Sequence, residues 1–284
     1  MCFLLFDARV QEFFMSETKE MPPVMILCGG KGTRLREVTE VLPKPMVPVG
    51  EWPIVWHIMK CYASFGAKRF ILCLGYKSDE FINFFRNYMF HTSDVTIKLG
   101  AEPSISCHNS SGLCDWEITL ARTGLDSMTG CRVFRAAKYL KPTDDKFFLT
   151  YGDGLCDLNI AELLEFHEKS KKMVTMTATH PEARFGQLLL DGDDLKGFTE
   201  KPPQSEGYIN GGYMVVNREF VDKYLYDDEK LILEQTPITQ AASDGNMAAF
   251  RHDGFWQCMD NPREYDMLNN MWNNKNTPWT KYWN

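Results

Sequence analysis

Residues 24–34 read VMILCGGKGTR, in which a short apolar run leads directly into a glycine-rich basic loop. We expect a buried strand over residues 24–27, with the loop at its carboxyl end. Glycines there let backbone N–H groups approach phosphate oxygens, because no Cβ stands in the way. The loop is neither a dinucleotide fingerprint, which needs glycine at Leu35, nor a P-loop, which needs Ser or Thr at Gly32. A tight turn without a ligand is the alternative interpretation.

Strand and helix patterns alternate after this loop. Helices are predicted over residues 54–62, 77–90, 132–140 and 160–170, and strands over 69–74, 147–151, 173–179 and 213–216. Such alternation is typical of an α/β fold in which a mainly parallel, mixed sheet is flanked by helices on both faces. We therefore predict a Rossmann-like α/β fold.

The alternation is interrupted between residues 91 and 126. Strand-like segments at 95–99 and 116–120 flank a polar stretch, so we predict an inserted β-hairpin subdomain there. A second hairpin is predicted where two apolar runs flank the turn sequence DGDD at 191–194. Residues 1–20 are expected to be an N-terminal extension outside the fold, with a docked surface helix as the alternative. The remaining residues, 21–284, form the predicted domain.

The composition is that of an ordinary globular protein, with 284 residues, 44% apolar and 24% charged. A formal net charge of −7 disfavours nucleic acid as a partner, so any phosphate site must be a local basic island. Residues 29–50 supply such an island, since their four basic and two acidic residues leave a charge of +2. No apolar run approaches the ~20 residues of a membrane helix. We expect a cytoplasmic protein with no membrane partner.

Nine cysteines are scattered along the chain, and no two have CxxC spacing. The odd number and the wide scatter argue against a disulfide framework and against a zinc site. We expect the cysteines to be buried small apolar residues in a reducing compartment.

Two aspartates are candidate metal ligands. Asp153 follows a predicted central strand in TYGDG, at the strand end where open α/β sheets bind ligands. Asp260 ends the apolar segment FWQCMD. Mg²⁺ usually takes one or two carboxylates together with substrate phosphates, so the two aspartates together fit phosphate chemistry. Separately, Asp153 could be a turn residue and Asp260 a helix N-cap.

Three further segments carry groups suited to a nucleotide or a sugar phosphate. In EKP, Glu200 could accept hydrogen bonds from sugar hydroxyls and Lys201 could pair with a phosphate. In INGGY, Asn210 offers an amide beside two glycines. The segment SMTG at 127–130 opens a helix that carries Arg132, which could hold a base edge or a phosphate. A chance loop triplet and an ordinary capped helix are the alternatives.

In this order, the motifs resemble those of the nucleotide-sugar pyrophosphorylases, or sugar-1-phosphate nucleotidyltransferases. The resemblance runs from about residue 25 to 282 and rests on LCGGKGTRL, LPKPMVPVG, TYGDG, RFG, EKP and INGGY. Within the family, HTSDVT, SMTG and FWQ are similar to the cytidylyl branch that acts on glucose 1-phosphate. The resemblance implies a GT-A-like nucleotidyltransferase fold, a Mg²⁺ cofactor, and conversion of CTP and glucose 1-phosphate into CDP-glucose and pyrophosphate. It also implies a homo-oligomer, with the 91–126 insertion as a candidate contact.

The resemblance assigns a role to each matching position. Catalytic roles fall to Arg34, Lys44 and Lys201. Nucleotide contacts are implied for Leu27, Gly29, Gly30, Gly32, Thr33, Arg34, Lys44, Thr129, Arg132 and Asp153. Sugar-phosphate contacts are implied for Gly186, Glu200, Lys201, Asn210 and Tyr213, and metal ligation for Asp153 and Asp260.

Some positions depart from the family pattern. Cys28 stands where alanine is usual, Arg122 stands where the cytidylyl branch has aspartate, and residues 100–115 differ in length and composition. These departures concern nucleotide choice and assembly. The alternatives are the same reaction with another nucleotide or sugar phosphate, a non-catalytic regulatory or sugar-nucleotide-sensing subunit, and a sugar-transferring enzyme with a related sheet.

Overall fold

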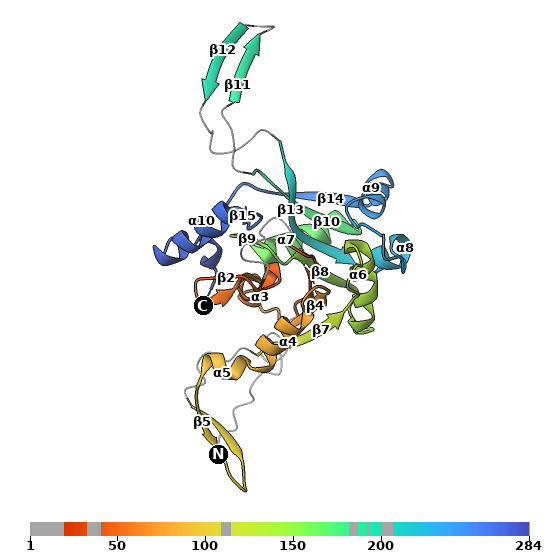
Figure 1. Cartoon of the computed structure of the whole chain (residues 1–284). Helices are drawn as coiled ribbons and strands as arrows, with labels where there is room; N and C mark the ends of the chain where they lie inside the picture. The colour runs from red at the N-terminus through yellow and green to blue at the C-terminus, as the bar shows by residue number, and fades with distance from the viewer. Residues whose placement is uncertain are drawn as a thin grey trace, which may run out of the picture.

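The computed structural model describes residues 20–32, 41–108, 115–181, 187–191, 194–199 and 207–283. Its central sheet contains β1 (Val24–Cys28), β4 (Arg69–Leu74), β7 (Glu117–Arg122), β8 (Lys146–Tyr151), β10 (Val174–Thr179), β13 (Ile209–Asn217) and β14 (Met247–His252). The strand order is β14-β10-β13-β8-β1-β4-β7 (Figure 1). Only β13 runs antiparallel to its neighbours in this sheet. The predicted α/β fold with a mainly parallel, mixed sheet is confirmed.

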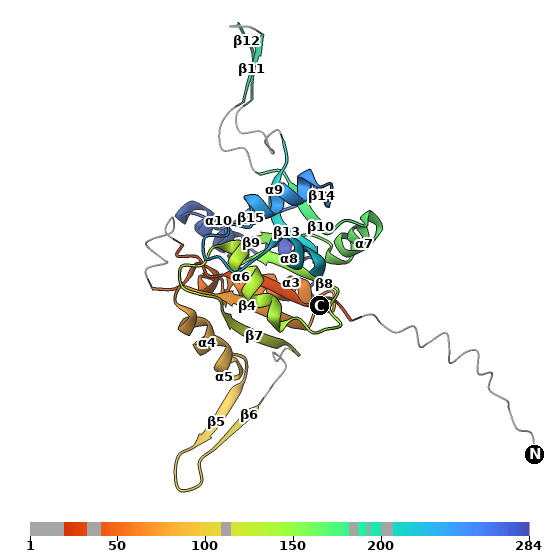
Figure 2. The same cartoon turned by 90° about the vertical axis from the view of Figure 1, so that its right-hand side faces the viewer.

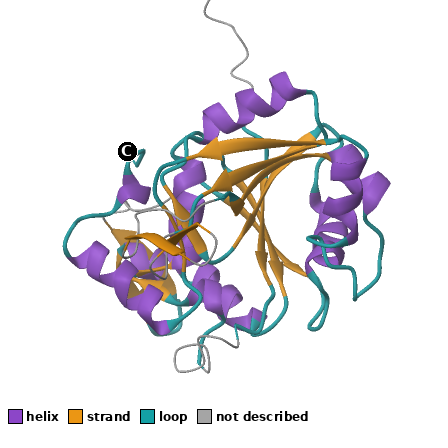
Figure 3. Cartoon of the chain, turned by 90° about the horizontal axis from the view of Figure 1, so that it is seen from above, coloured by secondary structure: helices purple, strands orange, loops and turns teal. Residues whose placement is uncertain are grey.

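Helices cover both faces of this sheet (Figure 3). One face packs against α3 (Ile54–Ala63), α7 (Ile160–Ser170) and α10 (Pro262–Asn273), and the other against α6 (Thr129–Ala136), α8 (Arg218–Tyr224) and α9 (Thr236–Ser243). Side chains of β1 alternate between the two cores, with Ile26 in one and Met25 in the other. A strand buried on both faces must be apolar throughout, which explains the uninterrupted apolar run of residues 24–28.

Two hairpins extend from the body at opposite ends (Figures 1 and 2). One consists of β11 (Gln187–Asp191) and β12 (Asp194–Thr199), as the sequence predicts. The other pairs β5 (Asp94–Lys98) with β6 (Ser104–His108). A hairpin is therefore inserted within residues 91–126 as predicted, but its second strand is β6 rather than the segment 116–120. β7 instead lies beside β4 in the central sheet, where Ile118 and Leu120 pack against the core.

The predicted helices differ from the observed ones mainly at their ends. The predicted helix over 77–90 is divided at Asn87 into α4 (Ser78–Arg86) and α5 (Tyr88–Thr92). Helix α6 begins at Thr129 rather than at 132, because the backbone of Gly130 and Cys131 is held by the carbonyl of Leu231.

Two sequence predictions concern cysteines and the N-terminus. All seven cysteines that the structure describes are free, and five of them are buried. Residues 1–19 lie outside the described residues, so the proposed extension stays a prediction. In the part of the chain that is described, no helix has the length and apolarity needed to cross a membrane.

The C-terminal tail packs on α3 through a buried imidazole. His57 is fully buried, and its Nε2 lies 2.8 Å from the carbonyl oxygen of Val49. Trp279, in the short helix η5 (Pro278–Thr280), donates its indole N–H to Nδ1 of His57 over 3.3 Å. Both contacts fit a neutral ring with its proton on Nε2. Burial lowers the pKa of His57 to about 4.

We predict that His57 makes the protein less stable in mild acid. The unfolded chain binds a proton at His57 below pH ~6.5, whereas the folded chain binds it only below its lower pKa. The free energy of unfolding should therefore fall as the pH drops through this interval, by up to about 3 kcal/mol from His57 alone. In urea unfolding at several pH values, His57→Gln should be less stable at neutral pH but lose less stability on acidification. Equal losses in both proteins would contradict the assignment.

Candidate functional site

A pocket of about 270 Å³ opens at the carboxyl ends of β1 and β8. It is lined by Leu27, Cys28, Gly29, Gly30, Gly32, Lys44, Pro45, Ser127, Met128, Thr129, Arg132, Tyr151, Gly152 and Asp153. Every predicted nucleotide-binding residue that the structure describes is in this set. Thr33 and Arg34 lie outside the described residues. The glycine loop, the segment around Lys44 and the start of α6 therefore meet at one place.

Lys44 connects the two predicted metal ligands. It begins the short helix η2 (Lys44–Met46), between prolines that restrict the backbone. Its Nζ lies 2.6 Å from Oδ2 of Asp153 and also pairs with Oδ1 of Asp260. The side chain of Lys44 is 12% exposed, whereas those of the two aspartates are about 30% exposed. Asp153 thus lines the pocket, and the more buried ammonium of Lys44 joins it to Asp260.

A two-stranded ladder brings the two aspartates together. Asp153 directly precedes β9 (Gly154–Cys156), which pairs with β15 (Trp256–Cys258). The amide of Met259 then donates to the carbonyl oxygen of Asp153 over 2.9 Å. On the C-terminal side of Met259, the backbone amide of Asp260 donates a hydrogen bond to the carboxylate of Glu264 over 2.6 Å. The backbone on both sides of Asp260 is therefore held in place.

The charge arrangement suits a cation and a polyphosphate. Burial alone would lower the pKa of Lys44, but Asp153 and Asp260 outweigh this effect and raise it above the usual value. Lys44 therefore stays charged. The two partly exposed carboxylates offer hard oxygen donors, a donor set that fits a hard divalent cation.

Arg132 faces the protein rather than the open pocket. Its guanidinium donates, over 2.7–3.2 Å, to the carbonyl oxygens of Gly29, Leu74, Gly124 and Leu125 and to the hydroxyl of Thr123. Burial lowers the pKa of Arg132. Although Arg132 lines the pocket as predicted, its hydrogen bonds tie the glycine loop to the segments that follow β4 and β7.

Glu234 is a polar residue at the site that the sequence analysis missed. It accepts a hydrogen bond from Thr129 over 2.6 Å and another from the hydroxyl of Tyr151. Burial raises the pKa of Tyr151, and the nearby Glu234 raises it further. Glu234 therefore fixes two pocket residues from one position behind them. Its segment, ILEQTP, matches no motif, so only the fold reveals this role.

Of the predicted sugar-phosphate residues, one lies near the pocket, one lies in the core and three are not described. Asn210 is exposed, with Nδ2 3.5 Å from the hydroxyl of Tyr151, so it lies near the pocket as expected. The sugar contact implied for Tyr213 does not fit the structure. Alternation along β13 turns Tyr213 into the core, where its hydroxyl donates to the carbonyl of Gly154 over 2.8 Å. Gly186, Glu200 and Lys201 lie outside the described residues.

The two departures near the site have different positions. Cys28 lines the pocket and is 1% exposed, and burial raises the pKa of its thiol. It therefore resembles alanine, the usual residue there, as a small and uncharged side chain. Arg122 is exposed and pairs with Asp79 of α4 at 2.8 Å. It is not among the described residues that line the pocket.

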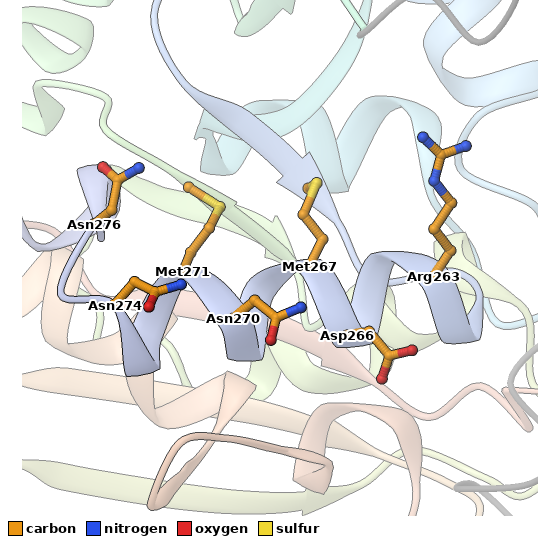
Figure 4. Close-up of a pocket in the computed structure, with 7 residues that line it drawn as sticks. All are labelled: Arg263, Asp266, Met267, Asn270, Met271, Asn274 and Asn276. Carbon is orange, nitrogen blue, oxygen red and sulfur yellow. The ribbon is translucent and has the colours of Figure 1, made fainter.

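A larger hollow of about 580 Å³ follows the outer face of α10 (Figure 4). It is lined by Arg263, Asp266, Met267, Asn270, Met271, Asn274 and Asn276, which all come from one helix and the turn after it. Figure 4 shows these side chains standing along the helix without converging on a common point. None of them is a predicted site residue, so we place the functional site at the glycine loop.

The fold and this site define a nucleotidyltransferase. Residues 23–265 match the Nucleotidyl transferase family, and the chain belongs to that family. It is 44% identical over 259 residues to the glucose-1-phosphate cytidylyltransferase of Salmonella typhi, covering 91% of this chain and 98% of the relative. It is 38% identical over 260 residues to a probable glucose-1-phosphate cytidylyltransferase of Bacillus subtilis, covering 91% and 99%. Enzymes of this family typically use a divalent metal ion.

Solved structures agree with the fold. The crystal structure of HddC from Yersinia pseudotuberculosis matches with a TM-score of 0.63 and 23% identity, covering 89% of this chain and all of that chain. At this identity the similarity concerns the fold alone.

We predict that Gly29→Ala destabilises the protein, whereas Gly30→Ala does not. A Cβ on Gly29 would lie 2.1 Å from Cζ of Arg132, so the guanidinium would have to leave its hydrogen-bond partners. A Cβ on Gly30 would have no atom of the described residues within 4 Å, which makes this variant a matched control for stability. Urea unfolding should show a loss of about 2 kcal/mol for Gly29→Ala. Equal stability of the two variants would contradict the role given to Arg132.

Proposed function

We propose that this protein transfers a cytidylyl group from CTP to glucose 1-phosphate, giving CDP-glucose and pyrophosphate. The observation that carries the proposal is the meeting of Lys44, Asp153 and Asp260 beside the glycine loop. Similarity over nearly the full length of glucose-1-phosphate cytidylyltransferases supports this choice of substrates. A non-catalytic subunit of the same fold is disfavoured, because Lys44, Asp153 and Asp260 are all present and Lys44 forms ion pairs with both aspartates.

The proposed reaction is an in-line displacement at phosphorus. An oxygen of the sugar phosphate attacks the α-phosphorus of CTP, and pyrophosphate leaves. No covalent enzyme intermediate is required, since the attacking phosphate oxygen is already a nucleophile. Catalysis then depends on positioning and on neutralising charge.

We propose that the metal ion is Mg²⁺ and that Asp153 and Asp260 bind it. When bound there, Mg²⁺ would neutralise phosphate charge and help to orient the triphosphate. Lys44 would bind the triphosphate with its ammonium group, in competition with the two carboxylates that it contacts in this structure. The backbone of Gly29, Gly30 and Gly32 would follow the phosphates.

The remaining assignments rest on the family resemblance. Thr33 and Arg34 would contact the nucleotide, with Arg34 adding positive charge. Gly186, Glu200 and Asn210 would contact the sugar, and Lys201 would hold its phosphate. Tyr213 is left out of this set, because its hydroxyl is already bonded to Gly154 in the core.

Pyrophosphate release tests the proposed function. Purified protein would be mixed with Mg²⁺, glucose 1-phosphate and one of CTP, UTP, dTTP, ATP or GTP. Release with CTP should exceed release with every other nucleotide. Asp153→Asn should lower kcat by roughly two orders of magnitude or more, because it removes a charged metal ligand. Asp115→Asn is the matched control, since Asp115 is 87% exposed and pairs only with the surface residue Lys68 among the ion pairs described.

Each outcome of this assay has a separate meaning. Preference for another nucleotide would contradict cytidylyl transfer and keep the family chemistry. No release with any nucleotide, while CTP still raises the unfolding temperature, would favour either a different sugar phosphate as substrate or the non-catalytic alternative. Near-normal turnover of Asp153→Asn would contradict the metal assignment.

We further propose that the chain forms a homo-oligomer through the β5–β6 hairpin. Ile97 and Ile105 face each other across this hairpin, and their side chains are 52% and 55% exposed. A two-stranded hairpin is only marginally stable by itself, so exposed apolar side chains on it favour contact with a second copy.

Sedimentation velocity tests the homo-oligomer. The unaltered protein should sediment as a multiple of 32.8 kDa, and Ile97→Glu should shift it toward the monomer. Tyr226→Ser is the control, because Tyr226 is 54% exposed outside the hairpin and its loss should leave the mass unchanged. A monomeric unaltered protein, or an oligomer that Ile97→Glu does not affect, would contradict the proposal.

A further inference from the structure

Cys156, Asp157 and His252 form a cluster of three different donor groups outside the pocket. One donor atom from each residue lies within 4.8 Å of the other two. Cys156 ends β9, Asp157 follows it, and His252 ends β14. Cys156 is 2% exposed, and the side chains of His252 and Asp157 are 13% and 18% exposed. The cluster is therefore mostly shielded from water.

The carboxylate in this cluster has an unsatisfied oxygen. Oδ1 of Asp157 is buried, and within the described residues it accepts no hydrogen bond of good geometry. Nε2 of His252 lies 2.9 Å away without donating to it, and instead contacts the carbonyl oxygen of Phe255 at 3.3 Å. A buried carboxylate oxygen without a hydrogen bond is costly unless a cation compensates for it. Within the described residues, the ion-pair partner of Oδ1 is His252, which carries a positive charge only when its imidazole is protonated. A bound cation would supply this charge while the imidazole stays neutral.

Gly254 leaves room beside the same atoms. A Cβ at this position would lie 2.4 Å from Oδ1 of Asp157 and 2.7 Å from Cε1 of His252. Any other residue there would press on the carboxylate and the imidazole together. The absence of a Cβ at Gly254 therefore lets the carboxylate and the imidazole lie close together against the backbone.

We propose that Cys156, Asp157 and His252 bind a thiophilic divalent cation of the Zn²⁺ class. Thiolate, imidazole and carboxylate are the three ligand types that proteins offer to Zn²⁺. Burial raises the pKa of the Cys156 thiol, so the thiol carries its proton until a cation displaces that proton to solvent. Two positive charges then balance one thiolate and one carboxylate, with the imidazole neutral. A site without net charge suits a shielded position.

This site is separate from the pair of aspartates in the pocket but connected to it. Cys156 pairs with Trp256 at one end of the β9–β15 ladder, and Gly154 pairs with Cys258 at the other. Asp153 lies three residues before Cys156, which is about 10 Å along an extended chain. A cation at Cys156 would therefore clamp the ladder that positions Asp153 and Asp260. No sequence motif indicates this site, because Asp157 and His252 are 95 residues apart in the chain.

Cobalt substitution tests the proposal directly. The full-length protein would be treated with a chelator, dialysed and titrated with Co²⁺, while the thiolate-to-cobalt charge-transfer absorption is recorded. One equivalent should produce the band, and Zn²⁺ should abolish it by competition. Cys156→Ala should lose the band. Cys258→Ala is the matched control, since Cys258 belongs to a second group of possible ligands with Asp260 and Glu264.

The outcomes either support or overturn the site. A band that is lost in Cys156→Ala and kept in Cys258→Ala supports it, as does a rise in unfolding temperature with Zn²⁺ that Cys156→Ala abolishes. No charge-transfer band, or a band lost only in Cys258→Ala, overturns it. If Cys156→Ala fails to fold by circular dichroism, His252→Gln keeps the thiol and should still lose saturable binding. Unchanged binding in His252→Gln also overturns the proposal.

Discussion

The double ion pair of Lys44 with Asp153 and Asp260 is the constraint on which the rest of the site depends. The two carboxylates are 107 residues apart in the chain, and a lysine from a third segment holds both. Two carboxylates so close together repel each other unless a cation lies between them. Burial of Lys44 strengthens this attraction, because the dielectric constant is lower than in water. The glycine loop and α6 surround this charged centre.

Hydrogen bonds from the core and from the segments around the pocket hold the residues of this centre in place. Below it, Tyr213 in the core donates to the carbonyl of Gly154, next to Asp153. Behind the pocket, Arg132 ties the glycine loop to the neighbouring strands, and Glu234 holds Thr129 and Tyr151. The hydrogen bonds of Tyr213, Arg132 and Glu234 described here are therefore made to other groups of the protein. The charged groups of the described site that the proposed ligands would meet are the carboxylates of Asp153 and Asp260 and the ammonium of Lys44.

Much of this arrangement could be predicted from the sequence, because local patterns carry it. The apolar run before the glycine loop predicts β1, and strand ends predict where Asp153 lies. The errors concern contacts between remote segments. The pairing of β7 with β4 depends on core packing that no local pattern records, and Tyr213 turns inward because of the pleat of β13. Glu234 has no sequence signal, since its role exists only when α6 and β8 lie beside it.

The central claim is that the nucleotide and its metal ion bind where Lys44 joins the two aspartates. A crystal structure of the protein with CTP and Mn²⁺ tests this claim most directly, because the anomalous signal of manganese locates the ion. We expect an anomalous peak between the carboxylates of Asp153 and Asp260, with Nζ of Lys44 on the triphosphate. A peak elsewhere beside the bound nucleotide, or CTP bound while Lys44 still pairs with both aspartates, would contradict the account.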